Sequence, residues 1–372
     1  MRSLIKKDVT KISARGAALA GLVLVLSLFL AACGDPTVAP APSTTAASGT
    51  TAAGATTAAG ASGGNQAVTL ALSYIPDVQF APYYVAQDKG YFTKEGLNVT
   101  FQHGTIDNLM ALVGQGKIQF ALASGDEVLQ ARAGGIPVRT VATQYQKYPV
   151  ALASLKGKGL TTPASLKGKT IGIPGQYGSN YIGLKVLLAA AHLTEDDVKV
   201  TNIGFTQREA ISQGKVDGAM VYSMNEPVQL ANAGVAVDVI QVSSVTNLAS
   251  VGLITSDSVI SSNPQLVQKM VRAVQLGIRD TIANPDAAFD SSIKIAPDSK
   301  GSDPNLSKLV LKEMVKYMTS DSVKGQPYGY NDPKLWETSA QFLLDNKLLQ
   351  TKVDSSTAFT NDYIKADQGI YS

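Results

Sequence analysis

The body of the chain alternates short apolar runs with segments whose apolar residues recur every three or four positions. The short runs predict strands, and the recurring spacing predicts amphipathic helices. Ten strands are expected, at 68–74, 97–101, 120–123, 138–144, 150–154, 170–173, 198–203, 218–222, 237–242 and 252–255. Six helices are expected between them, at 82–88, 107–114, 126–133, 181–191, 206–213 and 226–233. Such alternation is typical of an α/β protein with a mostly parallel sheet.

After Ser256 the pattern changes, and from Asn263 onward only helical spacing is found. The expected helices lie at 264–283, 285–295, 305–317, 333–346 and 359–368. The α/β body is therefore expected to carry a helical C-terminal extension.

A weak internal repeat relates two parts of the body. Residues 111–124, ALVGQGKIQFALAS, match residues 210–223, AISQGKVDGAMVYS. Any helix–glycine–strand unit can look similar, but these two occupy equivalent places in the two halves of the body. We therefore expect two lobes of similar construction.

The first 32 residues have a basic region followed by an apolar run, 17–32, and small residues. This pattern predicts a secretory signal peptide, too short for a membrane-spanning helix. The chain's only cysteine, Cys33, follows Leu30-Ala31-Ala32, which resembles a bacterial lipobox. The resemblance implies that Cys33 is lipidated and becomes the first residue of the mature protein. The alternative is an ordinary signal peptide with an incidental cysteine.

Residues 33–66 are almost entirely Ala, Thr, Ser, Gly and Pro, with one charged residue, Asp35. Such a segment cannot bury a core and is expected to be a flexible tether. Of the formal net charge of +3, residues 1–32 contribute +4 and Asp35 contributes −1, so the body from Ala67 onward is neutral. Neutrality gives no reason to expect nucleic acid or an anionic membrane surface as a partner.

Polar and aromatic residues gather where the predicted strands end, and ligands of parallel α/β lobes bind at the carboxyl ends of strands. The candidate ligand-binding residues are Tyr74, Asp77, Gln79, Phe80, Ser124, Asp126, Tyr145, Tyr148, Tyr177, Gly178, Ser179, Asn180, Tyr181, Tyr222, Asn225 and Glu226. An anion-binding cleft would carry Arg or Lys at the strand ends. Along the chain, the first such residue at a strand end is Lys147. The set therefore favours a neutral, flat, polar ligand with aromatic faces to stack on. Any single tyrosine fits the core or rim equally well, and Asp77 and Glu226 are equally compatible with helix capping.

The segment GIPGQYGSN, 172–180, places glycines at Gly172, Gly175 and Gly178 ahead of a helix. It matches neither the phosphate-binding GxxxxGK[ST] loop nor GxGxxG. Two interpretations remain open: backbone N–H groups at the helix start that hold a polar ligand edge, or a tight turn that needs small residues.

No sequence signature of catalysis or of metal binding is found. HExxH and CxxC do not occur, and the two histidines are interpreted as a surface residue, His103, and a residue at a helix end, His192. Trp336 shares an apolar helix face with Phe342 and Leu343 and is expected in the core. We expect no catalytic residue, no metal and no cofactor.

The family resemblance rests on four stretches, which occur in the order VAQDKGYFTKEGLNV, ALVGQGKIQFALASGDEVLQARAGGIPV, TPASLKGKTIGIPG and GKVDGAMVY. Together they resemble the solute-binding proteins of ABC importers, in the branch that binds alkanesulfonates, nitrate and thiamine pyrimidines. The resemblance covers about 68–275 and implies a two-lobed, type II periplasmic-binding-protein fold with the ligand cleft between the lobes. Lobe boundaries are expected at 67–159 and 160–248, with 249–372 returning to the first lobe, and crossovers near 153–159 and 248–253.

Within this branch, SGDEVLQARAGGIPV, YQKYPVAL, IGIPGQYGSNYIGLKVLL and NEPVQL most resemble the riboflavin-binding lipoproteins. Binders of a formylated thiamine pyrimidine are the alternative. Their Asp-Trp-x-Pro-Asn…His motif is replaced here by Ser73-Tyr74-Ile75-Pro76-Asp77, without the Trp, the Asn or the His.

The flavin resemblance implies roles for the candidate residues. Tyr74 would stack on the ring and Asp77 would take a polar edge, while Tyr145, Tyr177, Tyr181 and Tyr222 would form other walls. The ribityl hydroxyls would contact Gln79, Asn180, Asn225 and Glu226.

A monomer anchored on the extracytoplasmic face of the cell membrane through Cys33 would then deliver its ligand to an ABC permease. A cofactor-biosynthetic enzyme on the same fold is a second hypothesis. One yeast relative uses its own histidine and cysteine for pyrimidine synthesis, but the only cysteine here lies in the lipobox. A sensory protein that docks on a receptor is a third hypothesis.

Overall fold

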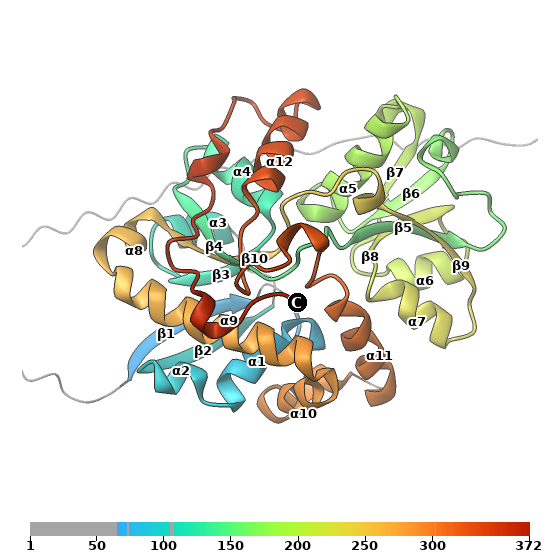
Figure 1. The fold of residues 1–372 in the computed structure, drawn as a ribbon. Coiled ribbons are helices and arrows are strands. Elements are labelled where there is room, and N and C mark those ends of the chain that lie inside the picture. Colours follow the sequence, from blue (N-terminus) through green and yellow to red (C-terminus); the bar gives the residue numbers. More distant parts are fainter. Residues whose placement is uncertain (1–64, 73, 105–107, 302) are drawn as a thin grey trace, which may run out of the picture. The chain divides into compact units, whose positions relative to one another are not determined.

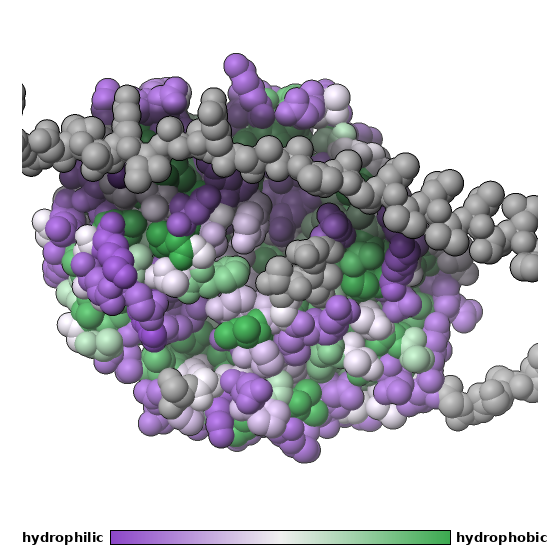
Figure 2. All heavy atoms as spheres, turned by 180° about the vertical axis from the view of Figure 1, so that it is seen from behind, coloured by the Kyte–Doolittle hydropathy of each residue, from purple (hydrophilic) through white to green (hydrophobic). Residues whose placement is uncertain are grey.

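The computed structural model describes residues 65–72, 74–104, 108–301 and 303–372 (Figure 1). The predicted signal peptide, Cys33 and most of the tether lie outside the described residues. No helix in the described ranges is long and apolar enough to cross a membrane. On the face shown in Figure 2, hydrophobic residues are scattered among hydrophilic ones and form no continuous band.

Ten strands form two five-stranded sheets, so every predicted strand is confirmed within two residues at each end. The first sheet has the order β2-β1-β3-β10-β4 and consists of β1 (Gln66–Leu72), β2 (Leu97–His103), β3 (Phe120–Ala123), β4 (Val138–Thr143) and β10 (Gly252–Ser256). The second has the order β7-β6-β8-β5-β9 and consists of β5 (Val150–Leu155), β6 (Thr170–Ile173), β7 (Lys199–Asn202), β8 (Gly218–Tyr222) and β9 (Val237–Gln241).

Each sheet is mixed, with four strands running one way and a single strand running against them. β10 pairs antiparallel with β3 and β4, and β5 pairs antiparallel with β8 and β9. β1 pairs parallel with β2 and β3, and β6 pairs parallel with β7 and β8. The prediction of a mostly parallel arrangement therefore holds for four strands of each sheet. The reversed strand in each sheet is the one formed directly after the chain crosses from the other sheet.

The two sheets repeat one topology, which confirms the internal repeat. Its first copy covers α3 (Leu109–Gly114) and β3, and its second covers α6 (Gln207–Ser212) and β8. β3 and β8 occupy the central position in the strand order of their sheets.

We define lobe 1 as residues 65–143 and 252–372, and lobe 2 as residues 150–241. β5 pairs in the second sheet, so the first crossing lies at 144–149 and not at the expected 153–159. The apolar run of β5 predicts a buried strand but carries no signal of the sheet it joins. The two crossing segments contact each other, since Gln144 and Tyr145 both donate backbone N–H groups to Val251 O, at 2.9 and 3.1 Å.

Helices flank both sheets (Figure 1). Lobe 1 includes α1 (Ala81–Asp88), α2 (Tyr91–Lys94), α4 (Gly125–Ala133) and α8 (Asp257–Ser262), whereas lobe 2 includes α5 (Gly178–Ala190) and α7 (Glu226–Asn232). The C-terminal helices are α9 (Pro264–Ala283), α10 (Pro285–Ile295), α11 (Pro304–Val315) and α12 (Pro333–Asp345). Each begins with proline after an Asn or Asp whose side chain caps it: Asn263, Asn284, Asp303 and Asp332.

The predicted helix at 359–368 is wrong, because only a short 3₁₀ turn, Ala366–Gln368, is present there. Thr360 N donates to Thr140 O and Thr140 N donates to Ala358 O, both at 2.9 Å. The edge of β4 therefore satisfies backbone groups that a helix would otherwise pair internally. Phe359 also stacks on Trp336, with ring centroids 5.4 Å apart, and Trp336 is buried in the core as expected.

The C-terminal helices extend the core of lobe 1. α9 and α10 pack on α1 (Figure 1). The approach of α9 to α1 is so close that a methyl group at Gly277 would collide with the carbonyl oxygen of Pro82. Among the described C-terminal helices, α11 contacts α7 of lobe 2, and none packs on a helix of lobe 2 as extensively as α9 and α10 pack on α1.

Candidate functional site

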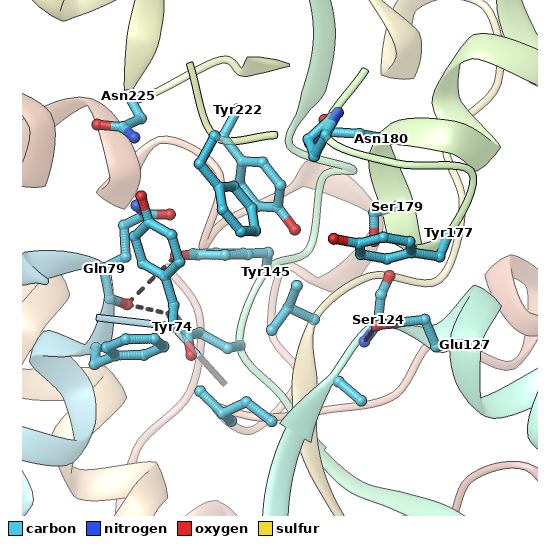
Figure 3. A pocket seen from close by; sticks show the side chains of 18 of the residues that line it. Tyr74, Gln79, Ser124, Glu127, Tyr145, Tyr177, Ser179, Asn180, Tyr222 and Asn225 are labelled. Carbon is cyan, nitrogen blue, oxygen red and sulfur yellow. Dashed lines mark hydrogen bonds between the residues drawn. The ribbon is translucent and has the colours of Figure 1, made fainter. Parts of the chain in front are cut away.

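A cavity of about 260 Å³ opens between the lobes and is lined from both of them (Figure 3). Its volume is slightly below the roughly 300–1,000 Å³ typical of small-molecule sites. The lining residues are Tyr74, Gln79, Phe80, Leu122, Ala123, Ser124, Glu127, Gln144, Tyr145, Pro174, Tyr177, Gly178, Ser179, Asn180, Phe205, Gln207, Tyr222, Asn225, Glu226 and Val251. Twelve of the sixteen predicted residues are therefore brought together at one cavity.

One wall of the cavity is aromatic and largely buried. It contains Tyr74, Phe80 and Tyr145, and Tyr145 is only 2% exposed. Gln144 Nε2 and Tyr145 Oη both donate to Gln79 O, at 3.0 and 3.4 Å (Figure 3). These bonds tie the crossing segment to the turn after β1, so the aromatic faces are fixed before any ligand arrives.

Tyr74 is held by an unexpected residue, His103. His103 Nδ1 lies 3.3 Å from Tyr74 O, and Nε2 lies 3.2 Å from Tyr84 Oη. A carbonyl oxygen only accepts, so we assign the proton to Nδ1 and the bond at Nε2 to donation by Tyr84. Burial lowers the pKa of His103, which favours this neutral form. His103 was interpreted as a surface residue; it is half-buried and also packs in a cluster with Phe80, Tyr84 and Phe101.

The opposite wall contains the start of α5. Ser179 and Asn180 line the cavity from the first turn, and Tyr177 lies just before it with 64% of its surface exposed. Gly178 has a φ of 67°, and a side chain at Gly175 would collide with the Tyr177 ring. These glycines therefore meet the needs of a tight turn, and the residues that follow them provide the polar groups.

Two side-chain amide oxygens in the lining are buried and have no hydrogen-bond partner among the described residues. They are Gln144 Oε1 and Asn180 Oδ1. Buried polar atoms are nearly always paired in folded proteins. Two such atoms at one cavity indicate that a ligand or water completes their hydrogen bonding.

Each lobe contributes one carboxyl group to the cavity, at positions that the internal repeat makes equivalent. Glu127 Oε2 accepts the N–H of Ser124, and Glu226 Oε2 accepts the N–H of Tyr222, both at 2.9 Å. Burial, with a smaller contribution from Asp126, raises the pKa of Glu127 to about 7, and burial raises that of Glu226 to about 7. No Lys or Arg is found among the described residues that line this cavity. The site therefore offers polar groups without fixed positive charge.

Asp126 and Tyr148 were expected in the site but lie outside the lining. Tyr148 Oη lies 2.9 Å from Asp126 Oδ2 and 3.0 Å from Ser179 O, and both residues are fully buried. They link α4 of lobe 1 to α5 of lobe 2, so we assign them a structural role.

Asp77 and Tyr181 are also outside the lining of this cavity. Asp77 Oδ1 accepts the N–H of Gln79 at 2.9 Å and caps a short 3₁₀ turn, Val78–Phe80. Tyr181 Oη donates to Glu195 Oε1 at 2.5 Å, on the side of α5 where Lys185 also contacts Glu195. Tyr181 is therefore removed from the candidate set, and Asp77 belongs to a neighbouring cavity described below.

Eight lining residues were not predicted: Leu122, Ala123, Glu127, Gln144, Pro174, Phe205, Gln207 and Val251. The repeat could have identified Glu127, because it is the counterpart of Glu226. Gln144 directly follows β4, where the strand-end rule applies. The described residues contain no group of three or more His, Cys, Asp or Glu that could hold a metal ion.

A family model described as NMT1/THI5 like matches residues 77–288. The riboflavin-binding protein RibY of Chloroflexus aurantiacus is 41% identical over 347 residues, which cover 92% of this chain and 96% of that protein. The chain belongs to the NMT1/THI5-like family. An enzyme is also similar to this chain: the 4-amino-5-hydroxymethyl-2-methylpyrimidine phosphate synthase of Aspergillus parasiticus is 29% identical over 231 residues, or 58% of this chain and 67% of that enzyme.

Solved structures show the same fold. The periplasmic aliphatic sulphonate binding protein SsuA from Escherichia coli superposes with a TM-score of 0.62 at 15% identity, covering 79% of this chain and 91% of that one. The two-lobed periplasmic-binding-protein architecture is therefore shared at low sequence identity.

Proposed function

We propose that this NMT1/THI5-like protein is the solute-binding component of an ABC importer and that it captures riboflavin for a membrane permease. The observation that carries the proposal is the cavity between the lobes, with buried aromatic faces on one side and amide, hydroxyl and carboxyl groups around it. Similarity to a riboflavin-binding protein over nearly the whole chain supports the same ligand class.

The flavin ring has the properties that this lining can recognise. An isoalloxazine is flat and apolar on its faces, and one edge presents an N–H donor between two carbonyl acceptors. Tyr74 and Tyr145 would contact the faces, while either Gln144 Oε1 or Asn180 Oδ1 would accept from the single N–H at the edge. Burial raises the pKa of Tyr74 to about 12, so its hydroxyl keeps its proton and remains a donor.

The protein acts without catalysis in this proposal. Pyrimidine phosphate synthases occur among its relatives, yet no His or Cys is present among the described residues that line the cavity. Closure of the lobes around the ligand, by motion at the two crossing segments, would produce the form that the permease receives.

Capture of a formylated thiamine pyrimidine by the same mechanism is the alternative. The pyrimidine synthases in the family favour it. The cavity itself favours the larger ring, because aromatic residues line it from both lobes.

A titration of the mature protein with riboflavin, the formylated pyrimidine and thiamine tests the ligand. Stacking on tyrosine should quench flavin fluorescence, with a dissociation constant in the micromolar to nanomolar range, or about 8–12 kcal/mol of binding free energy. Pyrimidine binding without flavin quenching would establish the alternative. If none of the three compounds binds, both ligand proposals are refuted.

We also propose that a lipid on Cys33 holds the protein at the extracytoplasmic face of the membrane. Cys33→Ser should abolish lipid labelling and membrane association, because a lipid chain supplies the anchor. The soluble protein should still bind ligand, because every residue that lines the cavity between the lobes lies after the tether, from Tyr74 onward. Membrane retention of this variant would contradict the anchor.

A further inference from the structure

A second cavity, of about 200 Å³, lies beside the first and also lies between the lobes. Tyr74 and Asn225 line both cavities, so the two spaces meet at these side chains. The second cavity is polar, and its lining includes Asp77, Arg208, Gln229, Asp298, Ser299 and Asp303. We call it the tail cavity, and the first one the ring cavity.

A chain of hydrogen bonds runs from the tail cavity to the ring cavity. Arg208 Nη1 donates to Gln229 Oε1 at 3.3 Å, and Gln229 Nε2 donates to Asn225 Oδ1 at 2.6 Å. Asn225 Nδ2 then donates to Glu226 Oε1 at 3.1 Å. The guanidinium at one end and the carboxyl group at the other fix the orientation of both amides. The wall shared by the two cavities is therefore a continuous, ordered polar surface.

The tail cavity also contains an unused hydrogen-bonding group. Ser299 is 3% exposed, and its Oγ has no partner among the described residues. A buried hydroxyl without a partner is costly in a folded protein. Its position in the lining indicates that it bonds to a molecule that enters the cavity.

The charges in this cavity disfavour an anion. Three carboxyl groups, those of Asp77, Asp298 and Asp303, line it with one guanidinium, that of Arg208. Arg208 is already paired with Glu209, which its Nε contacts at 2.9 Å. A phosphate would therefore meet more negative than positive charge, whereas hydroxyl groups can both donate to the carboxylates and accept from the amide and hydroxyl groups.

We propose that the tail cavity binds the neutral polyhydroxylated chain of a ligand whose flat ring occupies the ring cavity. The inference rests on the proposed function, for which the chain is the ribityl group of riboflavin. Tyr74 and Asn225 lie where ring and chain join. The same arrangement selects against a phosphate at the end of the chain.

Three flavins separate the contribution of the ring from that of the chain. Riboflavin carries the ribityl chain, lumiflavin has a methyl group in its place, and riboflavin 5′-phosphate adds a dianion at its end. In the unmodified protein, lumiflavin should bind about 10–100-fold more weakly than riboflavin, because several hydrogen bonds are missing. The phosphate ester should bind at least about tenfold more weakly than riboflavin.

Two variants then test the location. Gln229→Ala breaks the polar chain and Ser299→Ala removes the unpartnered hydroxyl. Each should weaken riboflavin binding about 3–10-fold and change lumiflavin binding by less than about twofold. Ser212→Ala is the matched control, because Ser212 lies on the exposed surface of α6 and donates to Glu209 O. It should change neither affinity.

The outcomes distinguish this inference from the proposed function. Suppose that all three flavins bind, but that the variants weaken riboflavin and lumiflavin binding equally, or weaken the binding of neither ligand. The ribityl chain then does not occupy the tail cavity, and the inference is overturned. Tighter binding of the phosphate ester than of riboflavin would likewise overturn it. If no flavin binds, the proposed function is refuted first, and the assignment of the tail cavity is refuted with it.

Discussion

Lobes 1 and 2 share one strand order, yet they present different surfaces to the cavity. On the side of lobe 1, Phe80 and Tyr145 are buried, Tyr74 is half-buried, and the Tyr145 hydroxyl donates to Gln79 O. In lobe 2, Tyr222 is half-buried, whereas Tyr177 and Phe205 are 64% and 59% exposed. The repeated fold thus determines where side chains converge, and the residues at those places differ in burial. We call the more buried aromatic side, with Phe80 and Tyr145, the platform, and the more exposed side, with Tyr177 and Phe205, the lid.

The repeat shows the same divergence at single positions. Ser124-Gly125-Asp126-Glu127 in lobe 1 corresponds to Ser223-Met224-Asn225-Glu226 in lobe 2. The two glutamates keep one role, since each accepts a backbone N–H near the end of its strand and lines the cavity. The residues before them differ, because Asp126 is buried against Tyr148 whereas Asn225 lines both cavities.

The largest expected difference between the lobes concerns their packing. In α9 of lobe 1, Gly277→Ala would press a methyl group against the backbone carbonyl of Pro82. In α5 of lobe 2, Gly183→Ala would place its methyl 2.7 Å from Val150 Cγ1 and 3.2 Å from Met220 Cε, which are side chains that can shift. We expect Gly277→Ala to lower the free energy of unfolding by about 3 kcal/mol and Gly183→Ala by about 1 kcal/mol, after both gain from helix propensity.

Urea denaturation followed by circular dichroism measures both losses. Each variant replaces a glycine in a helix interior, so either serves as the control for the other. Equal losses would show that the helical cover of lobe 1 is no tighter than the interior of lobe 2.

The next effect is on ligand binding. Tyr74→Ala should weaken riboflavin binding by about 1–3 kcal/mol, because it removes an aromatic face from the platform side. Phe205→Ala should weaken riboflavin binding less, by about 0.5–1.5 kcal/mol. Phe205 lies on the lid, and its ring meets the Tyr74 ring edge-on, with ring centroids 5.7 Å apart.

Tyr181→Ala is the matched control in the same fluorescence titration. Tyr181 is a tyrosine of α5 whose hydroxyl contacts Glu195 outside the cavity. A larger loss for Phe205→Ala than for Tyr74→Ala would reverse the assignment of platform and lid.

A further expected effect is a pH dependence of stability that the two lobes share. Burial raises the pKa of Glu127 and of Glu226 from 4.5 to about 7. Between these values the unfolded chain has lost the proton that the folded protein keeps, so stability falls as pH rises from about 4.5 to about 7. Between pH 5 and pH 8, Glu127→Gln and Glu226→Gln should each reduce this fall by about 2–3 kcal/mol, because each pKa unit corresponds to about 1.4 kcal/mol.

Thermal or urea unfolding at pH 5 and pH 8 measures how far the free energy of unfolding falls between these two pH values, for each variant and for the unmodified protein. Glu337→Gln is a suitable control, because Glu337 is exposed on α12 and pairs only with Lys334. An unchanged fall in either variant would mean that its carboxyl group is solvated in the folded protein.

The sequence predicts the strands well because each is a short buried apolar run, and it predicts the C-terminal helices because Asn or Asp before proline marks their starts. It fails at 359–368, where an apolar pattern compatible with a helix pairs with the edge of β4 instead. It also places the first crossing too late, since only long-range pairing decides which sheet β5 joins. Both errors depend on contacts that are distant in sequence.

For the site, strand ends locate the lining but do not give the direction of each side chain. Tyr181 follows three lining residues of α5, yet its hydroxyl donates to Glu195 outside the cavity. Glu127 lines the cavity, whereas its neighbour Asp126 is buried against Tyr148. Phe205 and Gln207 follow the short strand β7 and line the cavity without having been predicted.

The position of β10 also determines the order in which the sheets can be completed as the chain is made. Lobe 2 is one continuous segment, so all five of its strands are available as soon as β9 has emerged. Lobe 1 must wait, because β10 lies between β3 and β4 in its sheet. The neighbours of β4 are β10 and Phe359, both encoded after the whole of lobe 2. The lobe that begins the protein is therefore the last that can close its sheet.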